Sequence, residues 1–546
     1  MKKMFAATLL LIAGCGMQTR GPVETRAEGP TRIVISRGDL ARGHEATRVV
    51  NEVGALWLDT RFWTSDSRGV ATTDVIDLAQ DGLPAEPATV ADLTVSVNAL
   101  TPAGSSVVVQ VRTGSTFFQR GDTWTEWRAA ERAIQPAGRY AQVRTILTTT
   151  DPKKRPGVVD VTLAYRVNRT PMAGKVTLAS EKVQRIVASP VPFQYERQDQ
   201  GDLVWLRTTF DLDDVIKDET TEFGKLRALM RWTATRKNAR PKGWHAPGPY
   251  PWNIRKVIRD EDGGTIYGHC MSYCEVFITA AGAFGWQGRH WAIHGVRDTS
   301  HEVPEIWVNE LGKWVFFDPS LDTYYADPET GEPLNLLDMH ERYLKTVWKP
   351  NEQQRRGRTV NEGRLTRLRG KHPVKCVTGD YAYGKPTKWD WQWKHGYMTA
   401  GWLQLTPRNN WHSRPEPVHQ YFGWGPDGYG GFPLWYDEQT PLPEPTEDST
   451  PSLWYTRPRD FWWTLNQASF RLTRTGADTV RVECGNSQPF FKRYLAKRDG
   501  DFEPVEAVFT WTLTPGDNRL EVVPEDEFGK RGLASVAVIH YTPGGN

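Results

Sequence analysis

Cysteine is scarce in this sequence, and an excess of either charge is missing. The 546 residues contain five cysteines and no Cys-x-x-Cys pair. Because no histidine pair lies near two closely spaced cysteines, the sequence predicts no zinc site. The 68 basic and 65 acidic residues give a net charge of +3, without a basic stripe of the kind that binds nucleic acid. We therefore expect no metal, no cofactor and no nucleic-acid partner.

Long apolar runs are missing as well, apart from one short run at the N-terminus. Lys2 and Lys3 precede an apolar segment that is too short to span a bilayer and that ends in Ile12-Ala13-Gly14-Cys15. This arrangement resembles a bacterial lipoprotein signal, which implies that Cys15 is lipidated. We expect a lipid-anchored protein of the bacterial cell envelope, on the periplasmic or surface face. The alternative is an ordinary signal peptide.

The stretch from Tyr267 to Ser320 offers a cysteine, a histidine and an aspartate in that order. Cys270 opens a segment with helical spacing of apolar residues, which Gly285 is placed to end. A thiol at a helix N-terminus feels the positive end of the dipole, which favours the nucleophilic thiolate. His301 begins a strand and Asp318 closes the next, so we expect a hairpin to bring them together. This order predicts an activated-thiol hydrolase.

The same stretch resembles the transglutaminase-like superfamily, a papain-related group. The resemblance covers roughly residues 205–345, and it implies Cys270 as nucleophile, His301 as base and Asp318 as the group that orients the imidazole. The chain departs from the family at Gly288, where alanine is usual, and at Val303, where the family often has an aromatic residue. Pro304 also interrupts the expected strand. The pieces that carry the resemblance are Gly268-x-Cys270, Gly285-Trp286-Gln287-Gly288-Arg289, His301-x-x-x-Glu305, Gly312-Lys313-Trp314 and Asp318-Pro319-Ser320.

We expect a multi-domain fold, with an α+β papain-like or transglutaminase-like core flanked by all-β sandwiches. Alternating and β-branched runs between turn residues predict a jelly-roll-like N-terminal sandwich and an immunoglobulin- or fibronectin-like C-terminal one. Trp124–Trp127 and Gly138–Arg144 resemble strands of galactose-binding-like modules, and helices are expected over Thr221–Arg236 and Asp338–Trp348. The predicted boundaries are signal 1–15, tether 16–30, sandwich 31–167, connector 168–200, catalytic domain 201–350, basic and Trp-rich region 351–457, and sandwich 458–546.

Tryptophan is abundant, with 24 residues, and it is crowded between Trp389 and Trp463. Flat aromatic faces suit sugar rings and peptide backbones, so part of this region is a candidate for substrate contact. The alternative is that the rings fill the core between domains. The candidate substrate-binding residues are Trp244, Trp252 and Tyr267, one of which could complete an oxyanion site, and Trp389, Trp391, Trp393 and Trp411.

These patterns favour a lipid-anchored cysteine peptidase or amidase, with acyl transfer to an amine as the variant outcome. The expected partners are protein, peptide or glycoconjugate substrates and the membrane. One alternative is a non-catalytic polysaccharide-binding protein on the same scaffold. Another is a carbohydrate-active enzyme with acid and base groups among His412, His419, Asp427, Asp437 and Glu438. A disulfide between Cys376 and Cys484 stays open.

Overall fold

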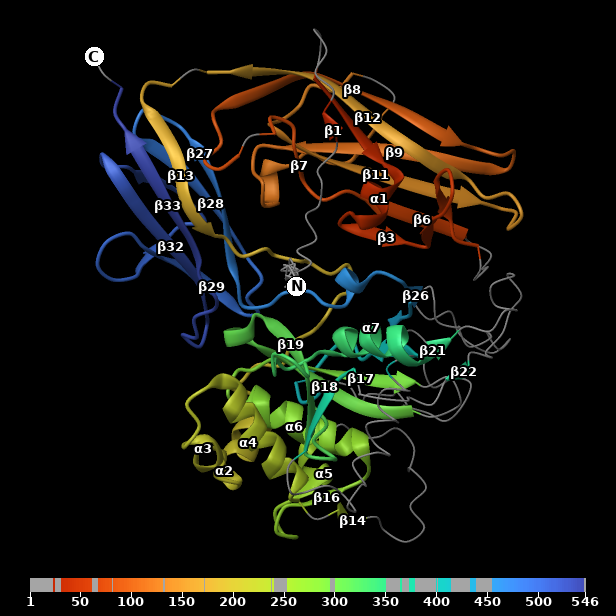
Figure 1. The fold of residues 1–546 in the computed structure, drawn as a ribbon, viewed down its shortest axis with the longest axis vertical. Coiled ribbons are helices and arrows are strands. Elements are labelled where there is room, and N and C mark those ends of the chain that lie inside the picture. The colour runs from red at the N-terminus through yellow and green to blue at the C-terminus, as the bar shows by residue number, and fades with distance from the viewer. Residues whose placement is uncertain are drawn as a thin grey trace, which may run out of the picture. The chain divides into compact units, whose positions relative to one another are not determined.

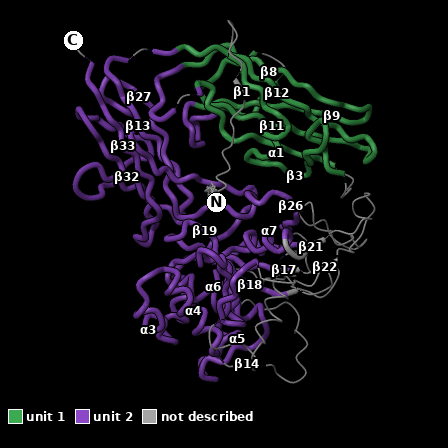
Figure 2. Tube along the Cα trace, in the orientation of Figure 1, with its two compact units in different colours: residues 1–79, 89–114, 125–168 green, residues 80–88, 115–124, 169–546 purple. Residues whose placement is uncertain are grey.

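The computed structural model shows a multi-domain, mostly β protein with several separate sheets (Figure 1). The chain divides into two compact units, the first of residues 1–79, 89–114 and 125–168, and the second of the remainder (Figure 2). Within the described part of the chain, no helix is long and apolar enough to cross a membrane. The structure describes residues 23–24, 31–60, 67–80, 82–130, 133–170, 172–236, 238–239, 253–294, 300–349, 364–365, 373–378, 399, 401–413, 433–437 and 454–544.

The first unit contains two six-stranded sheets around one apolar core. Inward residues such as Ile35, Val111 and Leu163 alternate with more exposed ones, as expected for strands buried on one face. One sheet has β1 (Val23–Glu24), β2 (Thr31–Ser36), β12 (Gly157–Arg169), β5 (Leu56–Leu58) and β4 (Val49–Asn51), with β8 (Ala88–Leu100) beside β12. The other has β10 (Arg128–Ala129), β9 (Ser105–Gly114), β11 (Tyr140–Thr149), β6 (Ser67–Thr72) and β3 (Glu45–Thr47), with β7 (Ile76–Asp77) beside β11; the helix α1 spans Arg37–Arg42.

The strand expected at Trp124–Trp127 is not formed. A short 3-10 helix, η1 (Gly121–Thr123), precedes these residues, Trp124 makes a single bridge, and continuous pairing resumes at β10. Trp127 instead lies against two arginines, with its ring centre 4.6 Å from the guanidinium carbon of Arg112 and 4.3 Å from that of Arg144. This cation–π contact holds the segment over the sheet, whereas alternation in the sequence alone suggested a strand.

In the second unit, the expected hairpin is formed by β18 (Ser300–Val308) and β19 (Lys313–Phe316). The turn between them is η2 (Asn309–Leu311), and Gly312 closes it with a φ of +61°, in the region that favours glycine. The hairpin belongs to a six-stranded sheet ordered β19-β18-β17-β24-β25-β26. The other strands are β17 (Gly288–His294), β24 (Trp402–Leu405), β25 (Leu434–Trp435) and β26 (Trp454–Tyr455).

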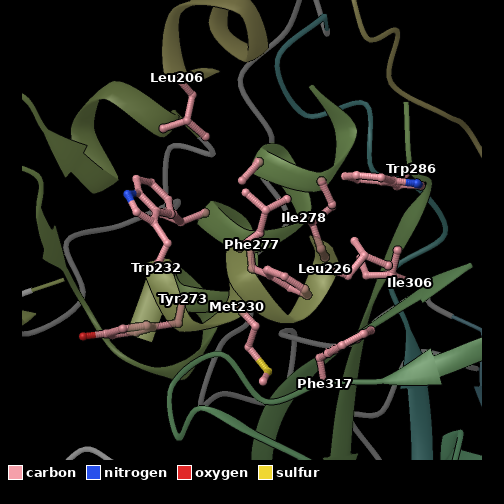
Figure 3. Packing of buried hydrophobic residues seen from close by; sticks show 14 of the residues in the cluster. Leu206, Leu226, Met230, Trp232, Tyr273, Phe277, Ile278, Trp286, Ile306 and Phe317 are labelled. Atoms are coloured by element: carbon pink, nitrogen blue, oxygen red, sulfur yellow. The ribbon is translucent and has the colours of Figure 1, made fainter. Parts of the chain in front are cut away.

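The helix that begins at Cys270 is α6 (Cys270–Gly282), and it is buried on every side. Its residues from Met271 to Ala281 are all buried, as expected for a helix that is apolar all round. Figure 3 shows Phe277 of α6 in one cluster with Met230 of α4 and with Phe317, which follows β19 and whose ring centre lies 5.3 Å from that of Phe277. The predicted helix over Thr221–Arg236 is observed as α4 (Glu222–Ala234). The other helices in this part of the chain are α2 (Gly201–Thr209), α3 (Leu212–Ile216) and α5 (Ile254–Val257).

A second apolar cluster includes residues of α7 (Leu336–Val347), the helix expected over Asp338–Trp348. It also contains Trp291, Trp314, Trp435 and Trp463, each at most 5% exposed. These described tryptophans are therefore core residues. Three small sheets complete this part of the chain. The first contains β14 (Asn238–Ala239), β16 (Thr265–Tyr267) and β15 (Ile258–Arg259). The second pairs β20 (Thr323–Ala326) with β23 (Lys375–Thr378), and the third pairs β21 (Trp348–Lys349) with β22 (Arg364–Leu365).

The C-terminal part of the second unit has two sheets that share one apolar core. One strand comes from the segment expected to be a connector, because β13 (Lys175–Lys182) pairs with β33 over its whole length. The larger sheet is ordered β13, β33 (Ser535–Thr542), β32 (Gly516–Asp526), β29 (Phe491–Lys497) and β30 (Glu503–Val505). The smaller has β27 (Ala468–Arg474), β28 (Thr479–Asn486) and β31 (Val508–Thr512), after the 3-10 turn η4 (Pro458–Asp460).

Candidate active site

The thiol of Cys270 lies at the N-terminus of α6. Gly268 turns the chain into the helix with a φ of +136°, a conformation that residues with a Cβ rarely adopt. His269 is the N-cap, and its carbonyl accepts the amides of Ser272 and Tyr273 at 2.9 and 3.3 Å. The Cys270 side chain is half-buried, and it is held at the end of the helix where the dipole favours a negative charge.

His301 and Asp318 meet across the hairpin. The Nε2–H of His301 donates to Oδ2 of Asp318 over 2.8 Å, and the imidazole is 7% exposed while the carboxylate is fully buried. The pairing of Glu305 with Phe316 sets the register that brings the start of β18 beside the residues after β19. The hairpin therefore brings His301 and Asp318 together, as their positions in the sequence predict.

The thiol of Cys270 interacts with His301, which leaves the imidazole between the sulfur and Asp318. Burial raises the pKa of Cys270, but the charge of His301 and hydrogen bonds from His269 and His301 outweigh it and lower the pKa from 9.0 to about 6. Burial lowers the pKa of His301, but the charges of Asp318 and Cys270 raise it well above its ordinary value. A thiolate–imidazolium pair follows from these opposite shifts.

Two further groups act on this pair. Glu302 opposes the lowering of the thiol pKa, and its Oε2 lies 3.0 Å from Nε2 of His290. Ser320 holds the other side of Asp318, because its backbone N–H and its hydroxyl both donate to Oδ1, at 3.0 and 2.6 Å. One carboxylate oxygen of Asp318 thus faces His301, while the other is fixed by Ser320.

The sequence patterns did not predict the contacts of His269 with Cys270 or of Ser320 with Asp318. Nδ1 of His269 lies 3.7 Å from Sγ of Cys270, which places a second imidazole beside the thiol. Ser320 follows Asp318 by two residues, a spacing at which aspartate side chains commonly accept a backbone N–H. The sequence signal for His269 is its position directly before the cysteine. The sequence signal for Ser320 is its position two residues after the aspartate.

Four residues along β18 from His301, a second charged pair is sealed in the core. Arg289 and Glu305 are both fully buried, and the guanidinium donates to Oε2 of Glu305 at 2.9 Å from Nε and 2.6 Å from Nη2. Trp291 donates to the same oxygen at 2.9 Å, and the backbone N–H of Leu336 donates to Oε1 at 2.7 Å. Arg289 also donates to the carbonyl of Phe461. This pair joins the sheet to α7 and to the segment that leads into the C-terminal sheets.

The positions at which the chain departs from the family pattern have local explanations. A Cβ at Gly288 would lie 2.6 Å from Ile306 and 3.1 Å from Ile278, so glycine lets β17 approach β18 and α6 closely. Val303 is fully buried in the cluster around α7. Pro304 stays in register with His290 of β17, and its carbonyl accepts the N–H of Phe317 at 3.1 Å. The missing N–H of proline therefore does not stop the hairpin.

Of the other candidate binding residues, Trp411 and Tyr267 lie in the described part of the chain. Trp411 is 4% exposed in the apolar cluster around α6, which leaves little of its ring for a substrate. Tyr267 donates its hydroxyl to Asp262 at 2.7 Å, and its ring lies 4.3 Å from the guanidinium carbon of Arg259. Trp244, Trp252, Trp389, Trp391 and Trp393 lie outside the described residues, as does Cys15.

The other described cysteines, Cys274, Cys376 and Cys484, are free thiols, and Cys376 and Cys484 form no disulfide with each other. Burial raises the pKa of Cys484 to about 12 and that of Cys274 well above its ordinary value. Among the described thiols with a shifted pKa, Cys270 is thus the one shifted toward ionisation. In the same part of the chain, no three His, Cys, Asp or Glu side chains are grouped as a metal site would require.

Comparison with known proteins gives weak structural matches. No family model matches the sequence, and no curated protein matches it. A Cytophaga hutchinsonii protein named as a candidate cysteine protease aligns over 47% of this chain and 78% of its own, with 11% identity and a TM-score of 0.17. Red sea bream transglutaminase aligns over 87% and 94%, with 10% identity and a TM-score of 0.20. The GH26-CBM35 β-(1,4)-mannanase of Podospora anserina aligns over 38% and 49%, with 14% identity and a TM-score of 0.14.

Proposed function

We propose that this chain is a cysteine hydrolase of amide bonds with a transglutaminase-like core, in which Cys270 is the nucleophile. The observation that carries the proposal is the order of three groups, with the imidazole of His301 between the Cys270 thiol and the Asp318 carboxylate. A pKa of about 6 makes the thiol an anion at neutral pH, without a substrate to induce it. Such a site suits acyl chemistry, in which a strong nucleophile and a proton donor must stand side by side.

In the first half of the reaction, the thiolate of Cys270 attacks the amide carbonyl carbon and forms a C–S bond. The carbonyl oxygen gains a negative charge at the N-terminus of α6, where the backbone N–H of Cys270 can donate a hydrogen bond and the helix dipole favours the charge. His301 gives its proton to the amide nitrogen, the C–N bond breaks and the amine leaves. The chain then holds the acyl group as a thioester.

In the second half, His301 is neutral and accepts a proton from water. The hydroxide attacks the thioester carbonyl, the C–S bond breaks, and the products are a carboxylic acid and the thiolate of Cys270 beside the His301 imidazolium. Asp318 orients the ring and stabilises its charge in both halves, and Ser320 keeps Asp318 in place. An amine in place of water would give transfer, and we favour hydrolysis.

The substrate class and the location are further parts of the proposal. Peptide or glycoconjugate amides of the cell surface suit an exported enzyme with flanking β-rich modules, held to a membrane through lipid on Cys15. Polysaccharide binding by an aromatic platform has less support, because Trp411, Trp435 and Trp463 of the 389–463 region are buried. No contact of the described residues favours glycoside hydrolysis.

The test separates acylation from turnover. The full chain is mixed with a p-nitrophenyl ester, and peptide mass spectrometry then locates the acyl group; amine release from a library of plain and glycosylated peptide amides is followed in parallel. We expect the acyl group on Cys270, and roughly 10³-fold or greater loss of amine release in Cys270→Ser. Cys376→Ser, another half-buried thiol, is the matched control and should retain both signals. Acylation of another residue, or equal turnover by Cys270→Ser, would refute the proposal.

A further inference from the structure

The residue directly before the nucleophile carries an unusual side chain for its position. His269 is the N-cap of α6, where Ser, Thr, Asp or Asn usually accept an amide hydrogen of the first turn. The imidazole of His269 makes no such capping bond. This position therefore forgoes the helix stabilisation that a capping side chain would give.

The side chain of His269 faces the sulfur instead. Its Nδ1 lies 3.7 Å from Sγ of Cys270, within hydrogen-bond distance for sulfur. The backbone of His269 is fixed by the two amides that its carbonyl accepts, from Ser272 and Tyr273. Helix formation therefore holds the imidazole beside the thiol, independently of the hairpin that carries His301.

We propose that His269 is a second catalytic imidazole, whose Nδ1–H donates a hydrogen bond to the Cys270 thiolate. This inference rests on the proposed function, since it assigns a role within the same reaction. His301 and His269 then divide the work. His301 bonds Asp318 through Nε2 and moves a proton, whereas His269 remains a donor to the sulfur throughout.

A fixed donor is useful at two moments of the reaction. Before attack it stabilises the thiolate, and during deacylation it stabilises the sulfur as the C–S bond breaks and the sulfur leaves as an anion. Hydrogen bonds to charged groups contribute more than hydrogen bonds between neutral groups. A donor that does not give up its proton keeps this contribution in both steps, which His301 cannot do.

The charged groups around the thiol set the background against which His269 acts. His301 favours the thiolate, and Glu302 disfavours it. Cys274, one turn further along α6, is buried with a raised pKa and stays protonated. Asp318 is separated from the sulfur by His301, to which it is bonded. Of these groups, His301 and His269 favour the anion, and they come from different elements.

The experiment is the pH profile of Cys270 alkylation by iodoacetamide, resolved by peptide mass spectrometry on the full chain. His269→Leu removes the donor, whereas His269→Asn keeps an N–H close to the position of Nδ1 and does not titrate. We expect His269→Leu to move the alkylation midpoint upward by about one pH unit, so that labelling at pH 6 slows roughly fivefold. His269→Asn should recover most of this loss.

His540→Leu, an exposed histidine of β33, is the control and should leave the midpoint unchanged. An unchanged midpoint in folded His269→Leu, or an equal shift in the Leu and Asn variants, would overturn the role as donor. If His269→Leu does not fold, His269→Ala takes its place as the variant without a donor, with the same upward shift expected. A chain that shifts as expected but cleaves no amide would refute the proposed reaction and leave the His269–thiolate bond standing.

Discussion

The two ends of β18 use buried charge in opposite ways. His301 and Glu305 lie four residues apart on one strand, and therefore on the same face of the sheet. At one end Glu305 accepts fixed donors from Arg289, Trp291 and Leu336, and the whole pair is closed to solvent. At the other end Asp318 bonds His301, and His301 interacts with the thiol of Cys270. This thiol is half-buried, and its charge depends on whether it is protonated.

This difference fits a structural role for the Arg289–Glu305 pair and, under the proposed function, a chemical role for the His301–Asp318 pair. Every oxygen of Glu305 has a donor that cannot move, so the pair holds elements together and has no group left to react. Asp318 is held just as firmly, by Ser320 and His301, but His301 also bonds the half-buried thiol of Cys270, which can ionise. The same register thus builds a rigid support and a reactive site within one hairpin.

The largest expected effect comes from removing the charge at the reactive end. Asp318→Asn keeps the size of the side chain and its bond from Ser320, but it no longer stabilises the imidazolium or fixes its tautomer. We expect amide hydrolysis to fall by about 10³–10⁴-fold with little change in thermal stability. Asp499→Asn, an exposed position, should have wild-type activity. A loss below tenfold for Asp318→Asn would contradict the assigned role.

The next effect tests the structural end. Glu305→Ala leaves the Arg289 charge buried without its carboxylate, which typically costs 3–5 kcal/mol of unfolding free energy. Urea denaturation followed by tryptophan fluorescence measures the change. Exposed Glu329→Ala should stay within about 0.5 kcal/mol of wild type. Glu305→Ala stability within 1 kcal/mol of wild type would show that the tryptophan-lined pair does not support the fold.

The sequence predicts the local elements that carry the three site residues better than it predicts the packing around them. Cys270 at a helix start and the His301–Asp318 hairpin follow from spacing and turn residues, which are local signals. The packing of Trp411 and Trp463 and the pairing of β13 with β33 depend on segments far apart in the chain, which composition does not reveal. His269 was missed because its part depends on a side-chain direction, and sequence gives no direction at a helix cap.

A smaller effect concerns a buried carboxyl on the far side of the same helix. Glu275 of α6 is fully buried, and among the described residues no group hydrogen-bonds to either of its oxygens, so burial raises its pKa well above the ordinary value. The unfolded chain ionises this group above about pH 4.5 while the folded chain does not, so folding stability falls as pH rises. Glu275→Met should therefore stabilise the chain by about 1–3 kcal/mol at pH 8 and by less at pH 5.

Thermal unfolding at both pH values measures the difference between Glu275→Met and wild type. The matched control is Glu341→Met, an exposed glutamate of α7, which should show the same small change at both pH values. A gain that is larger at pH 5 than at pH 8 would contradict the assigned ionisation of Glu275.

The smallest expected effect is none at all. Cys376 and Cys484 are free thiols, so a reducing agent should leave the thermal midpoint and the urea midpoint of the full chain unchanged. Mass spectrometry of the alkylated, unreduced chain should find both residues modified after denaturation. A drop in stability on reduction would show that a disulfide joins them.

The most direct test of the central claim is the pH at which Cys270 ionises. Peptide-resolved alkylation of the native chain between pH 4 and 10 gives that value, with the same peptide in the urea-unfolded chain as reference. The account predicts a midpoint of about 6 in the native chain and an ordinary thiol midpoint, near 9.0, after unfolding. A native midpoint equal to the unfolded one would mean that His301 and Asp318 do not activate the thiol, and the proposed enzyme would fall with it.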